Sequence, residues 1–425
     1  MSDPTDRWRA AVAATALLAA AGAVAGSAGL LVAAALPLGA LAISRLGTGP
    51  DPSLRVRRDI DPTPAPPGRP VAVRLVVENV GDRVLRDVRV IDGVPDDLAA
   101  LSGSPRAAAA LDPGETTLVS YDLAARRGTH AFDPPTIHCR SVGAGRRATV
   151  EPAVEGDDRV ECRIDAGAPP IDDEGALAGG QRSTDDPGSG LEFHSVREYH
   201  PEDPADRIDW RHYAKRDDLA TINYRRRTGA TVVIVVDARE ATRVAAGPGR
   251  PSAVELSAYA ATRATTDLLA GGNEIAVAVI GADGPDVDGL YWLDPGRGSD
   301  HRARAVSRFQ AAADATATDV AVDDQISRVA SLAPPRSQLL VFSPLLDDRL
   351  VEAVETWGAH ALARTLCSPD VLTHNTVTGT VARVRRQARL ARCQAAGVRT
   401  VDWKRGTPLA VVLERAFARE PGGGQ

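Results

Sequence analysis

The fold of the larger part of this chain is decided by the stretch Thr231-Val232-Val233-Ile234-Val235-Val236-Asp237. Five consecutive apolar β-branched residues, 232–236, are typical of a strand that is buried on both of its faces. Strands of this kind occur in parallel sheets that carry helices on both sides. The stretch therefore predicts an α/β domain, and Asp237 marks the end of its first strand.

The residues after this strand alternate between short apolar runs and segments with helical spacing. The expected strands are 274–280, 338–342, 360–366 and 398–403. The expected helices are 252–270, 301–313, 323–332, 347–357, 377–396 and 408–418. This alternation predicts a doubly wound α/β domain, which we place at residues 229–420.

The region before it, residues 51–164, carries short strands of alternating polarity. They are expected at 71–77, 84–90 and 116–123. Turn sequences separate them, as in Asp112-Pro113-Gly114-Glu115, so we expect an antiparallel, immunoglobulin-like β-sandwich. Residues 51–70 are rich in proline and are interpreted as a linker that leads into an edge strand. Residues 165–190 are polar and rich in glycine and are interpreted as a flexible linker.

The N-terminal residues 10–44 contain no charged side chain. A bilayer span needs about 20 apolar residues, so this run is long for one span and short for two. Gly26-Ser27-Ala28-Gly29 interrupts the run near its middle, which favours a transmembrane hairpin of two short helices. One long tilted helix and a cleavable signal peptide are the alternatives.

Arginines flank the apolar run on both sides. Arg7 and Arg9 precede it, and Arg45, Arg55, Arg57 and Arg58 follow it. Positive charge is enriched on the cytoplasmic side of membrane proteins, and only a hairpin places both flanks there. We therefore expect a protein of the cell membrane whose folded domains face the cytoplasm.

Composition and motifs exclude several classes of function. The 425-residue chain has a net charge of -6, which argues against a nucleic-acid partner. Its cysteines lack the close spacing of a zinc site or redox pair and are expected to be small buried hydrophobic residues. They are Cys139, Cys162, Cys367 and Cys393. No phosphate-binding loop or Gly-x-Ser-x-Gly elbow is present, so we expect no catalytic residues and no cofactor.

A segment that mixes charged and aromatic residues, 191–228, joins the two domains. Its central part reads Val196-Arg-Glu-Tyr-His-Pro-Glu-Asp-Pro-Ala-Asp-Arg-Ile-Asp-Trp-Arg-His-Tyr-Ala-Lys215. It resembles the domain-of-unknown-function-58 family, whose hallmark is Arg-x-Tyr, an acidic step, Arg-Ile-Asp-Trp, and Ala followed by a basic residue. The matching residues are Arg197, Tyr199, Asp203, Arg207, Ile208, Asp209, Trp210, Ala214 and Lys215. Glu202 departs from the glycine that is usual in the family. The order of hairpin, β-rich domain, signature and α/β domain is also similar.

The same segment contains two histidines and two aspartates that could form a metal or acid/base cluster. They are His200, Asp203, Asp209 and His212. The other interpretation is a structural latch between the sandwich and the last domain. We prefer the latch, because nothing else in the sequence indicates that these side chains converge on a metal ion.

The resemblance implies that the last domain is similar to a von Willebrand factor type A domain. Intact members carry Asp-x-Ser-x-Ser after the first strand, and these oxygens hold a divalent cation such as Mg²⁺. Here Arg239 and Ala241 replace the two serines, and a later strand end supplies Ser343. We expect a degenerate site of Asp237, Arg239 and Ser343, with no metal, in which Arg239 pairs with Asp237. A helix cap is the simpler role for Asp237.

The resemblance also implies a partnership with MoxR-type AAA+ ATPases, which act as chaperones in the maturation of protein complexes. We expect a non-enzymatic, membrane-anchored assembly or adaptor protein whose partners are the lipid bilayer, such an ATPase and a client protein. One alternative is a divalent-cation-dependent adhesion or ligand-binding module. Another is a hydrolase that uses Ser343 with Asp347 or His360.

Overall fold

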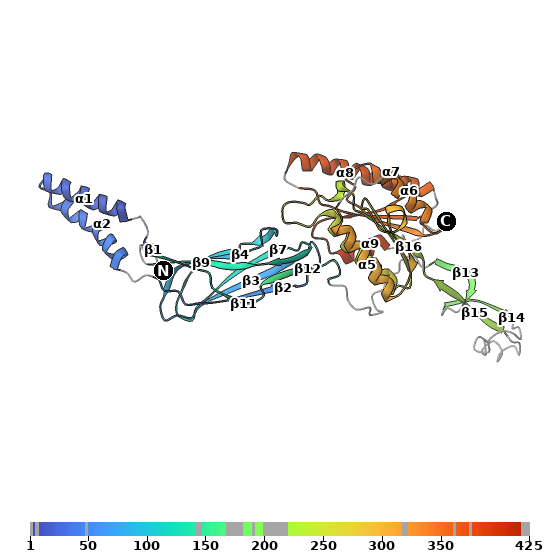
Figure 1. The fold of residues 1–425 in the computed structure, drawn as a ribbon, viewed down its shortest axis with the longest axis horizontal. Helices are drawn as coiled ribbons and strands as arrows, with labels where there is room; N and C mark the ends of the chain where they lie inside the picture. The colour runs from blue at the N-terminus through green and yellow to red at the C-terminus, as the bar shows by residue number, and fades with distance from the viewer. Residues whose placement is uncertain are drawn as a thin grey trace. The chain divides into compact units, whose positions relative to one another are not determined.

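The computed structural model describes residues 3–4, 8–46, 50–141, 146–166, 182–188, 192–198, 220–316, 322–359, 363–373 and 376–417. The chain divides into two compact units, whose folds are drawn in Figure 1. The first contains Met1–Ala166 and Pro248–Pro251, and the second contains Gly167–Gly247 and Ser252–Gln425.

The first unit contains a helical hairpin near its N-terminus. Helix α1 (Trp8–Val24) and helix α2 (Ala28–Leu46) are separated by a tight turn, in which Gly26 has a φ of 60°. The helices approach closely at Gly22, where an added Cβ would lie 3.0 Å from the Leu31 side chain. The break at Gly26-Ser27 is thus where the sequence predicts it. Within the described residues, no helix combines the length and the apolar character that a bilayer crossing requires.

The rest of the first unit contains two five-stranded sheets that share one apolar core. The first has the order β1 (Asp3–Pro4), β10 (Arg146–Val150), β9 (Asp133–Arg140), β4 (Leu85–Gly93), β6 (Arg106–Leu111). The second has the order β11 (Val154–Gly156), β2 (Leu54–Asp61), β3 (Pro70–Asn79), β7 (Thr116–Ala124), β5 (Ala100–Gly103). Strands β8 (Gly128–Ala131) and β12 (Arg159–Cys162) form a separate pair. The three expected strands correspond to β3, β4 and β7.

Strand β2 corrects the interpretation of residues 51–70 as a linker. It pairs with β3 over its whole length, from Leu54 opposite Asn79 to Asp61 opposite Ala72. Its buried positions are Val56, Arg58 and Ile60, at the period of two that a strand requires. The charged residue in the middle of this inward-facing set conceals the alternation, which is why the sequence was interpreted as a linker.

Arg58 connects the two sheets through their shared core. Its buried guanidinium donates to the Asp92 carboxylate of β4 and to the Asp133 carbonyl, and it lies 4.4 Å from the centre of the Phe132 ring. The Tyr121 hydroxyl of β7 also donates to Asp92. Burial, followed by the hydrogen bond to Asp92, raises the pKa of Tyr121 well above its ordinary value. Tyr121 therefore stays a neutral donor to the carboxylate.

Replacing Arg58 is expected to destabilise this unit strongly. Arg58→Ala leaves the Asp92 carboxylate buried without its cation, a change that costs about 3–5 kcal/mol. Arg57→Ala, at the exposed neighbouring position of β2, is the matched control and should change stability by less than about 0.5 kcal/mol. Hydrogen exchange of β3 and β7 peptides measures the stability of this unit alone. Equal protection in the two variants would show that the buried ion pair does not stabilise the sandwich.

The second unit is built on a six-stranded sheet of order β18-β17-β16-β19-β20-β21. The strands are β16 (Thr231–Asp237), β17 (Glu274–Ile280), β18 (Tyr291–Gly296), β19 (Gln338–Phe342), β20 (Ala363–Pro369) and β21 (Arg399–Trp403). All neighbouring pairs are parallel except β17 with β18. The parallel strands are the predicted ones. The antiparallel edge strand β18 was not expected, because it ends in Asp294-Pro295-Gly296, a turn-like sequence.

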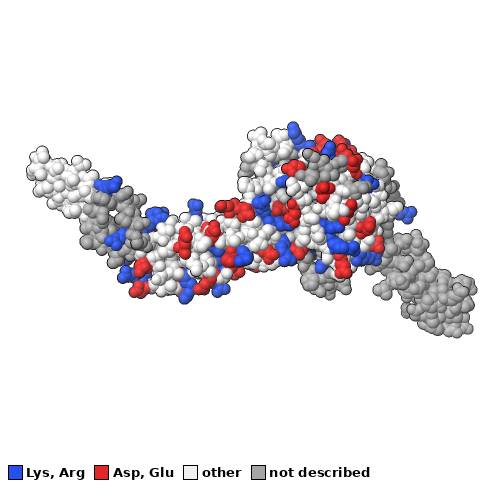
Figure 2. Space-filling view, in the orientation of Figure 1, with Lys and Arg blue, Asp and Glu red and all other residues white. Residues whose placement is uncertain are grey.

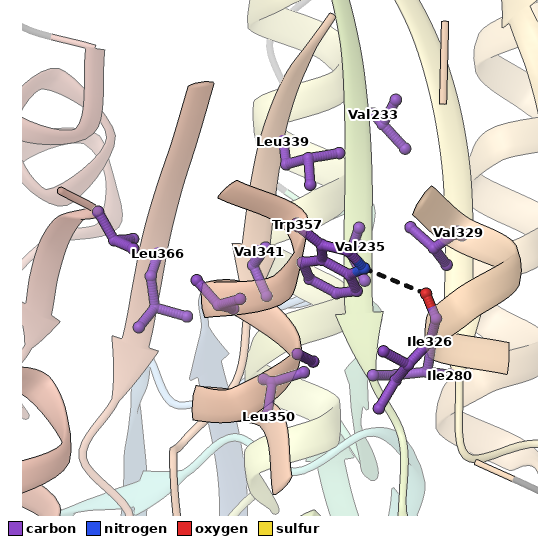
Figure 3. Packing of buried hydrophobic residues seen from close by; sticks show 14 of the residues in the cluster. Val233, Val235, Ile280, Ile326, Val329, Leu339, Val341, Leu350, Trp357 and Leu366 are labelled. Atoms are coloured by element: carbon purple, nitrogen blue, oxygen red, sulfur yellow. Dashed lines mark hydrogen bonds between the residues drawn. The ribbon is translucent and has the colours of Figure 1, made fainter. Parts of the chain in front are cut away.

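Helices cover both faces of this sheet (Figure 1). On one face lie α4 (Ala253–Ala270), α5 (Ser299–Asp314) and α9 (Leu409–Phe417), and on the other lie α6 (Val322–Leu332), α7 (Arg349–Ala359) and α8 (Val377–Ala395). Figure 3 shows Trp357 of α7 packed among Val235, Val341 and other sheet residues. Its indole Nε1 donates to the Ile326 carbonyl of α6 over 3.1 Å, so one side chain fixes two helices on the sheet.

A smaller three-stranded sheet precedes β16 in the chain. Its order is β13 (Arg182–Gly188), β15 (Ala220–Thr228), β14 (Glu192–Glu198), and both pairs are antiparallel. Strand β13 lies inside the predicted flexible linker 165–190, so that interpretation is wrong for residues 182–188. Its sequence, Arg-Ser-Thr-Asp-Asp-Pro-Gly, lacks the apolar alternation of a strand. Its pairing with β15 depends on residues far along the chain, from Arg182 opposite Thr228 to Gly188 opposite Tyr224.

Candidate functional site

Polar residues meet where two neighbouring parallel strands end. Strand β16 ends at Asp237, and Ser343 directly follows β19. Val236 of β16 lies opposite Phe342 of β19, which brings the two polar residues to the same edge of the sheet. Arg239 and Asp347 follow in the two loops. We call these four residues, Asp237, Arg239, Ser343 and Asp347, the Arg239 cluster.

The cluster lies at the point where the sheet changes its direction of winding. Strand β16 leads into α4 on one face, whereas β19 leads into α7 on the other. The chain therefore leaves the two neighbouring strands in opposite directions. In open α/β sheets, the carboxyl ends of two such strands are the usual place for a bound ligand.

Arg239 binds Asp237 through a bidentate ion pair. Its Nε donates to Oδ1 over 2.8 Å and its Nη2 donates to Oδ2 over 2.9 Å. The Ser343 hydroxyl also donates to Oδ2, over 2.7 Å, and the Arg239 backbone N–H donates to Oδ1 over 3.3 Å. Both oxygens of this fully buried carboxylate thus accept two hydrogen bonds each, and Asp237 has no free position for a ligand.

The other side of the same guanidinium binds Asp347. Nη1 donates to its Oδ2 over 2.9 Å and Nη2 to its Oδ1 over 3.1 Å. Burial alone would lower the pKa of Arg239, but the hydrogen bonds and charges of Asp237 and Asp347 outweigh it and raise the pKa above its ordinary value. The three charged groups carry a net charge of -1. Solvent reaches mainly the Asp347 side chain, which is 36% exposed.

Backbone geometry beneath Arg239 requires a glycine. Gly281 follows β17 with a φ of 83°, and an added Cβ would lie 2.5 Å from both the N and the Cα of Arg239. Its N–H donates to the Gln325 side chain of α6 over 2.8 Å. The close approach of the two loops therefore depends on the absence of a side chain at residue 281.

The loop that carries Asp347 is held by helix α8. Arg386 donates to the Pro344 carbonyl over 3.1 Å, and Arg389 donates to the Leu346 carbonyl over 2.8 Å and to Asp348 over 2.7 Å. Within the loop, the buried Leu345 has a φ of 53°, a left-handed conformation that is unfavourable for a residue with a branched side chain. Such strain persists only where surrounding contacts impose it.

The geometry matches the pairing of Arg239 with Asp237 that the sequence suggested. It does not support a helix cap at Asp237, because the N-cap of α4 is Ser252, whose side chain accepts from Glu255. In the part of the chain that the structure describes, no group of three or more His, Cys, Asp or Glu residues is arranged to hold a metal ion. The Arg239 guanidinium supplies the positive charge beside the Asp237 carboxylate.

From the sequence, Asp347 is assigned only to the hydrolase alternative and Gly281 is not named. Both residues follow a buried strand closely, and this position in the sequence is the signal that could have assigned them to the site. Ser343 makes a poor nucleophile here, because its buried hydroxyl donates to Asp237 and accepts from the Leu345 N–H. His360 lies outside the described residues.

Most of the signature segment lies outside the described residues. Arg197 lies in β14, opposite Thr221 of β15. The other signature residues lie outside the described residues, and so do His200 and His212. They are Tyr199, Asp203, Arg207, Ile208, Asp209, Trp210, Ala214 and Lys215. The choice between a structural latch and a ligand cluster therefore stays a prediction.

The cysteines are confirmed as buried residues. All four thiols are inside the protein, and none forms a disulfide. Burial raises the pKa of Cys139 to about 11 and that of Cys367 to about 12. Thiols with such pKa values remain protonated at neutral pH, which makes them unreactive.

Comparison with known families identifies the part of the chain that holds the cluster. Residues 195–369 match the family described as "Protein of unknown function DUF58". This part of the chain is assigned to the DUF58 family. The DUF58 match runs from β14 to the end of β20 and includes all four residues of the Arg239 cluster.

Solved structures add little to this assignment. The chain is similar to a Salmonella alpha-2-macroglobulin mutant at 21% identity, a match that covers 27% of this chain and 10% of the other, with a TM-score of 0.20. It is similar to a Vibrio harveyi GH20 exo beta-N-acetylglucosaminidase at 8% identity, covering 82% and 75% of the two chains, with a TM-score of 0.19. These TM-scores carry no argument about fold or function. No curated protein matches the chain.

Adding a methyl group at Gly281 is expected to disturb the cluster. Gly281→Ala brings a Cβ into the Arg239 backbone and adds about 1–3 kcal/mol of overpacking to the cost of a positive φ. Gly272→Ala is the matched control, because Gly272 has a φ of 76° but nothing within 4 Å of the added Cβ. Urea unfolding followed by tryptophan fluorescence compares them. If both variants lose the same free energy of unfolding, the added Cβ at residue 281 does not clash with the Arg239 backbone.

Magnesium is expected not to bind at this site. Both Asp237 oxygens are already hydrogen-bonded, and Arg239 supplies the positive charge. Calorimetric titration of the EDTA-treated protein with Mg²⁺ should give only the heat of dilution. A binding heat that saturates at one Mg²⁺ ion per chain with high affinity would contradict this account of the cluster.

Proposed function

We propose that this DUF58 protein is a non-enzymatic, membrane-anchored assembly or adaptor protein that works with a MoxR-type AAA+ ATPase in the maturation of a protein complex. The observation that carries the proposal is the Arg239 cluster. The carboxyl ends of the two strands, where an α/β sheet usually binds its ligand, are joined by a side chain of the protein itself. A protein whose usual ligand position is occupied in this way acts through its outer surfaces.

The last domain, in this proposal, is a von Willebrand factor type A-like domain that has exchanged its cation for an arginine. The exchange preserves the positive charge beside Asp237 and removes the open coordination position through which a cation-dependent adhesion site recruits its ligand. The bidentate pair supports this reading, because a guanidinium matches a carboxylate in shape as well as charge. The immunoglobulin-like sandwich would offer a second binding surface.

The helical hairpin is proposed as the membrane anchor. Large apolar side chains on both helices face outward, among them Leu17, Val24, Val32 and Leu36. Water is a poor solvent for such a surface and lipid is a good one. Helices of 17 and 19 residues are near the lower limit of about 17–25 residues for a span. With both flanks rich in arginine, the folded units would face the cytoplasm.

The anchor and the partnership are tested in separate experiments. In alkaline carbonate extraction, the full chain should stay with membranes, whereas a chain that lacks residues 8–46 should be released. Release of both would remove the proposed anchor.

For the partnership, a MoxR-type ATPase encoded in the same genome is purified and mixed with the gently solubilised full chain. We expect a complex by analytical size exclusion, and no ATP hydrolysis by the DUF58 chain alone. Failure to bind in either nucleotide state, or robust hydrolysis without the ATPase, would overturn the proposed function.

A further inference from the structure

Helix α8 carries an apolar stripe on its solvent-exposed side. Val377, Val381 and Val384 are 84%, 47% and 66% exposed. The stripe continues through three exposed alanines, so that its residues recur at alternating steps of four and three. We call this set the α8 seam: Val377, Val381, Val384, Ala388, Ala391 and Ala395. Steps of four and three are the heptad spacing of a helix that packs along another helix.

The seam is not the face that joins α8 to its own domain. The buried residues of α8 lie on the opposite side of the helix, where they contact the sheet and the loop after β19. They are Gly379, Arg386, Leu390 and Cys393. A helix that covers a sheet normally has a polar outer side, so a second apolar stripe needs a separate explanation. At about 1.5 Å per residue, the seam runs for ~27 Å, which is enough for a partner helix of five turns.

The charge of α8 indicates what kind of partner fits. The helix contains five arginines and no Asp, Glu or Lys, although the chain as a whole carries a net charge of -6. Arg386 and Arg389 bind groups inside the domain, whereas Arg385 and Arg392 border the seam. Arg392 is paired with Glu355 over 2.7 Å, and no described residue pairs with Arg385. Figure 2 shows a largely white surface with a few blue groups over the first turns of α8.

The two borders of the seam differ, which decides between possible occupants. Arginines follow one border, and the neutral Thr380, Gln387 and Gln394 follow the other. In an antiparallel pair of two identical α8 helices, Arg385 and Arg392 would face the same arginines of the second copy. In a parallel pair they would face neutral residues. Self-association therefore gains nothing from charge or is opposed by it, whereas an acidic border on a partner is favoured in either direction.

We propose that α8 is a docking site for an amphipathic helix of another protein, with Asp or Glu along its edge and large aliphatic side chains opposite Ala388, Ala391 and Ala395. The three alanines leave room along the C-terminal half of the seam, and the three valines form a ridge along its N-terminal half. The partner helix therefore carries its smaller residues opposite the valines. This docking site does not depend on the ATPase partnership proposed above.

The test uses two synthetic 21-residue helical peptides that have the same Leu and Ala seam. One has Glu at all border positions and the other has Lys. Fluorescence anisotropy on the detergent-solubilised full chain is expected to show that the Glu peptide binds at least 10-fold more tightly than the Lys peptide. The double variant Val377→Ser/Val384→Ser should lose at least 10-fold of this affinity, and Arg385→Glu should lose the preference for the Glu peptide.

Val244→Ser is the matched control, because Val244 is another valine of the same unit that is 43% exposed. It should bind the Glu peptide as the unchanged chain does, and circular dichroism should show that all variants remain folded. Equal binding of the two peptides, no binding, or unchanged binding by the double valine variant would overturn the proposal. Sedimentation velocity completes the test. A dimer that Val384→Ser dissociates would assign the seam to a second copy and would also overturn it.

Discussion

The guanidinium of Arg239 lies between two carboxylates, which lie at or shortly after the ends of two neighbouring strands of the sheet, β16 and β19. Asp237 ends the strand that leads to one layer of helices, and Asp347 precedes the helix α7 of the other layer. A buried carboxylate such as Asp237 is costly unless it is paired, and Arg239 is the cation that pairs it. Because the same group also binds Asp347, it ties the β16 and β19 loops together. The carboxyl ends of the two strands at the switch point are therefore joined by a side chain of the protein itself.

Other features of the α/β unit follow from this requirement. Gly281 leaves space for the Arg239 backbone, Leu345 accepts an unfavourable φ, and α8 holds the Asp347 loop through Arg386 and Arg389. The sandwich uses the same chemistry elsewhere, since Arg58 joins its two sheets through Asp92. In both units, buried arginines connect segments that are far apart in the sequence.

Local pattern was enough to predict the parts that depend on local sequence. The run of valines predicted β16, and helical spacing predicted the six main helices of the α/β unit. The pairing of Arg239 with Asp237 was an expectation from the family resemblance, not from local pattern. Prediction failed where distant residues decide the structure. Strand β2 was missed because the partner of Arg58 lies 34 positions away, and Asp347 was missed as a ligand of Arg239 because they are 108 positions apart. Strand β18 was hidden by a turn-like end.

The central claim is that Arg239 is the cation that stabilises the buried Asp237 carboxylate. The most direct test is whether Asp237→Asn changes stability in opposite directions in the presence and absence of Arg239. Asp237→Asn is introduced into the unchanged chain and into Arg239→Met, and the free energy of unfolding is measured for all four proteins. In the unchanged chain the substitution should destabilise, because it removes an ion pair. In Arg239→Met it should stabilise by about 1–3 kcal/mol, because it removes a buried and unpaired charge. If Asp237→Asn destabilises both proteins equally, Arg239 is not the partner that Asp237 requires.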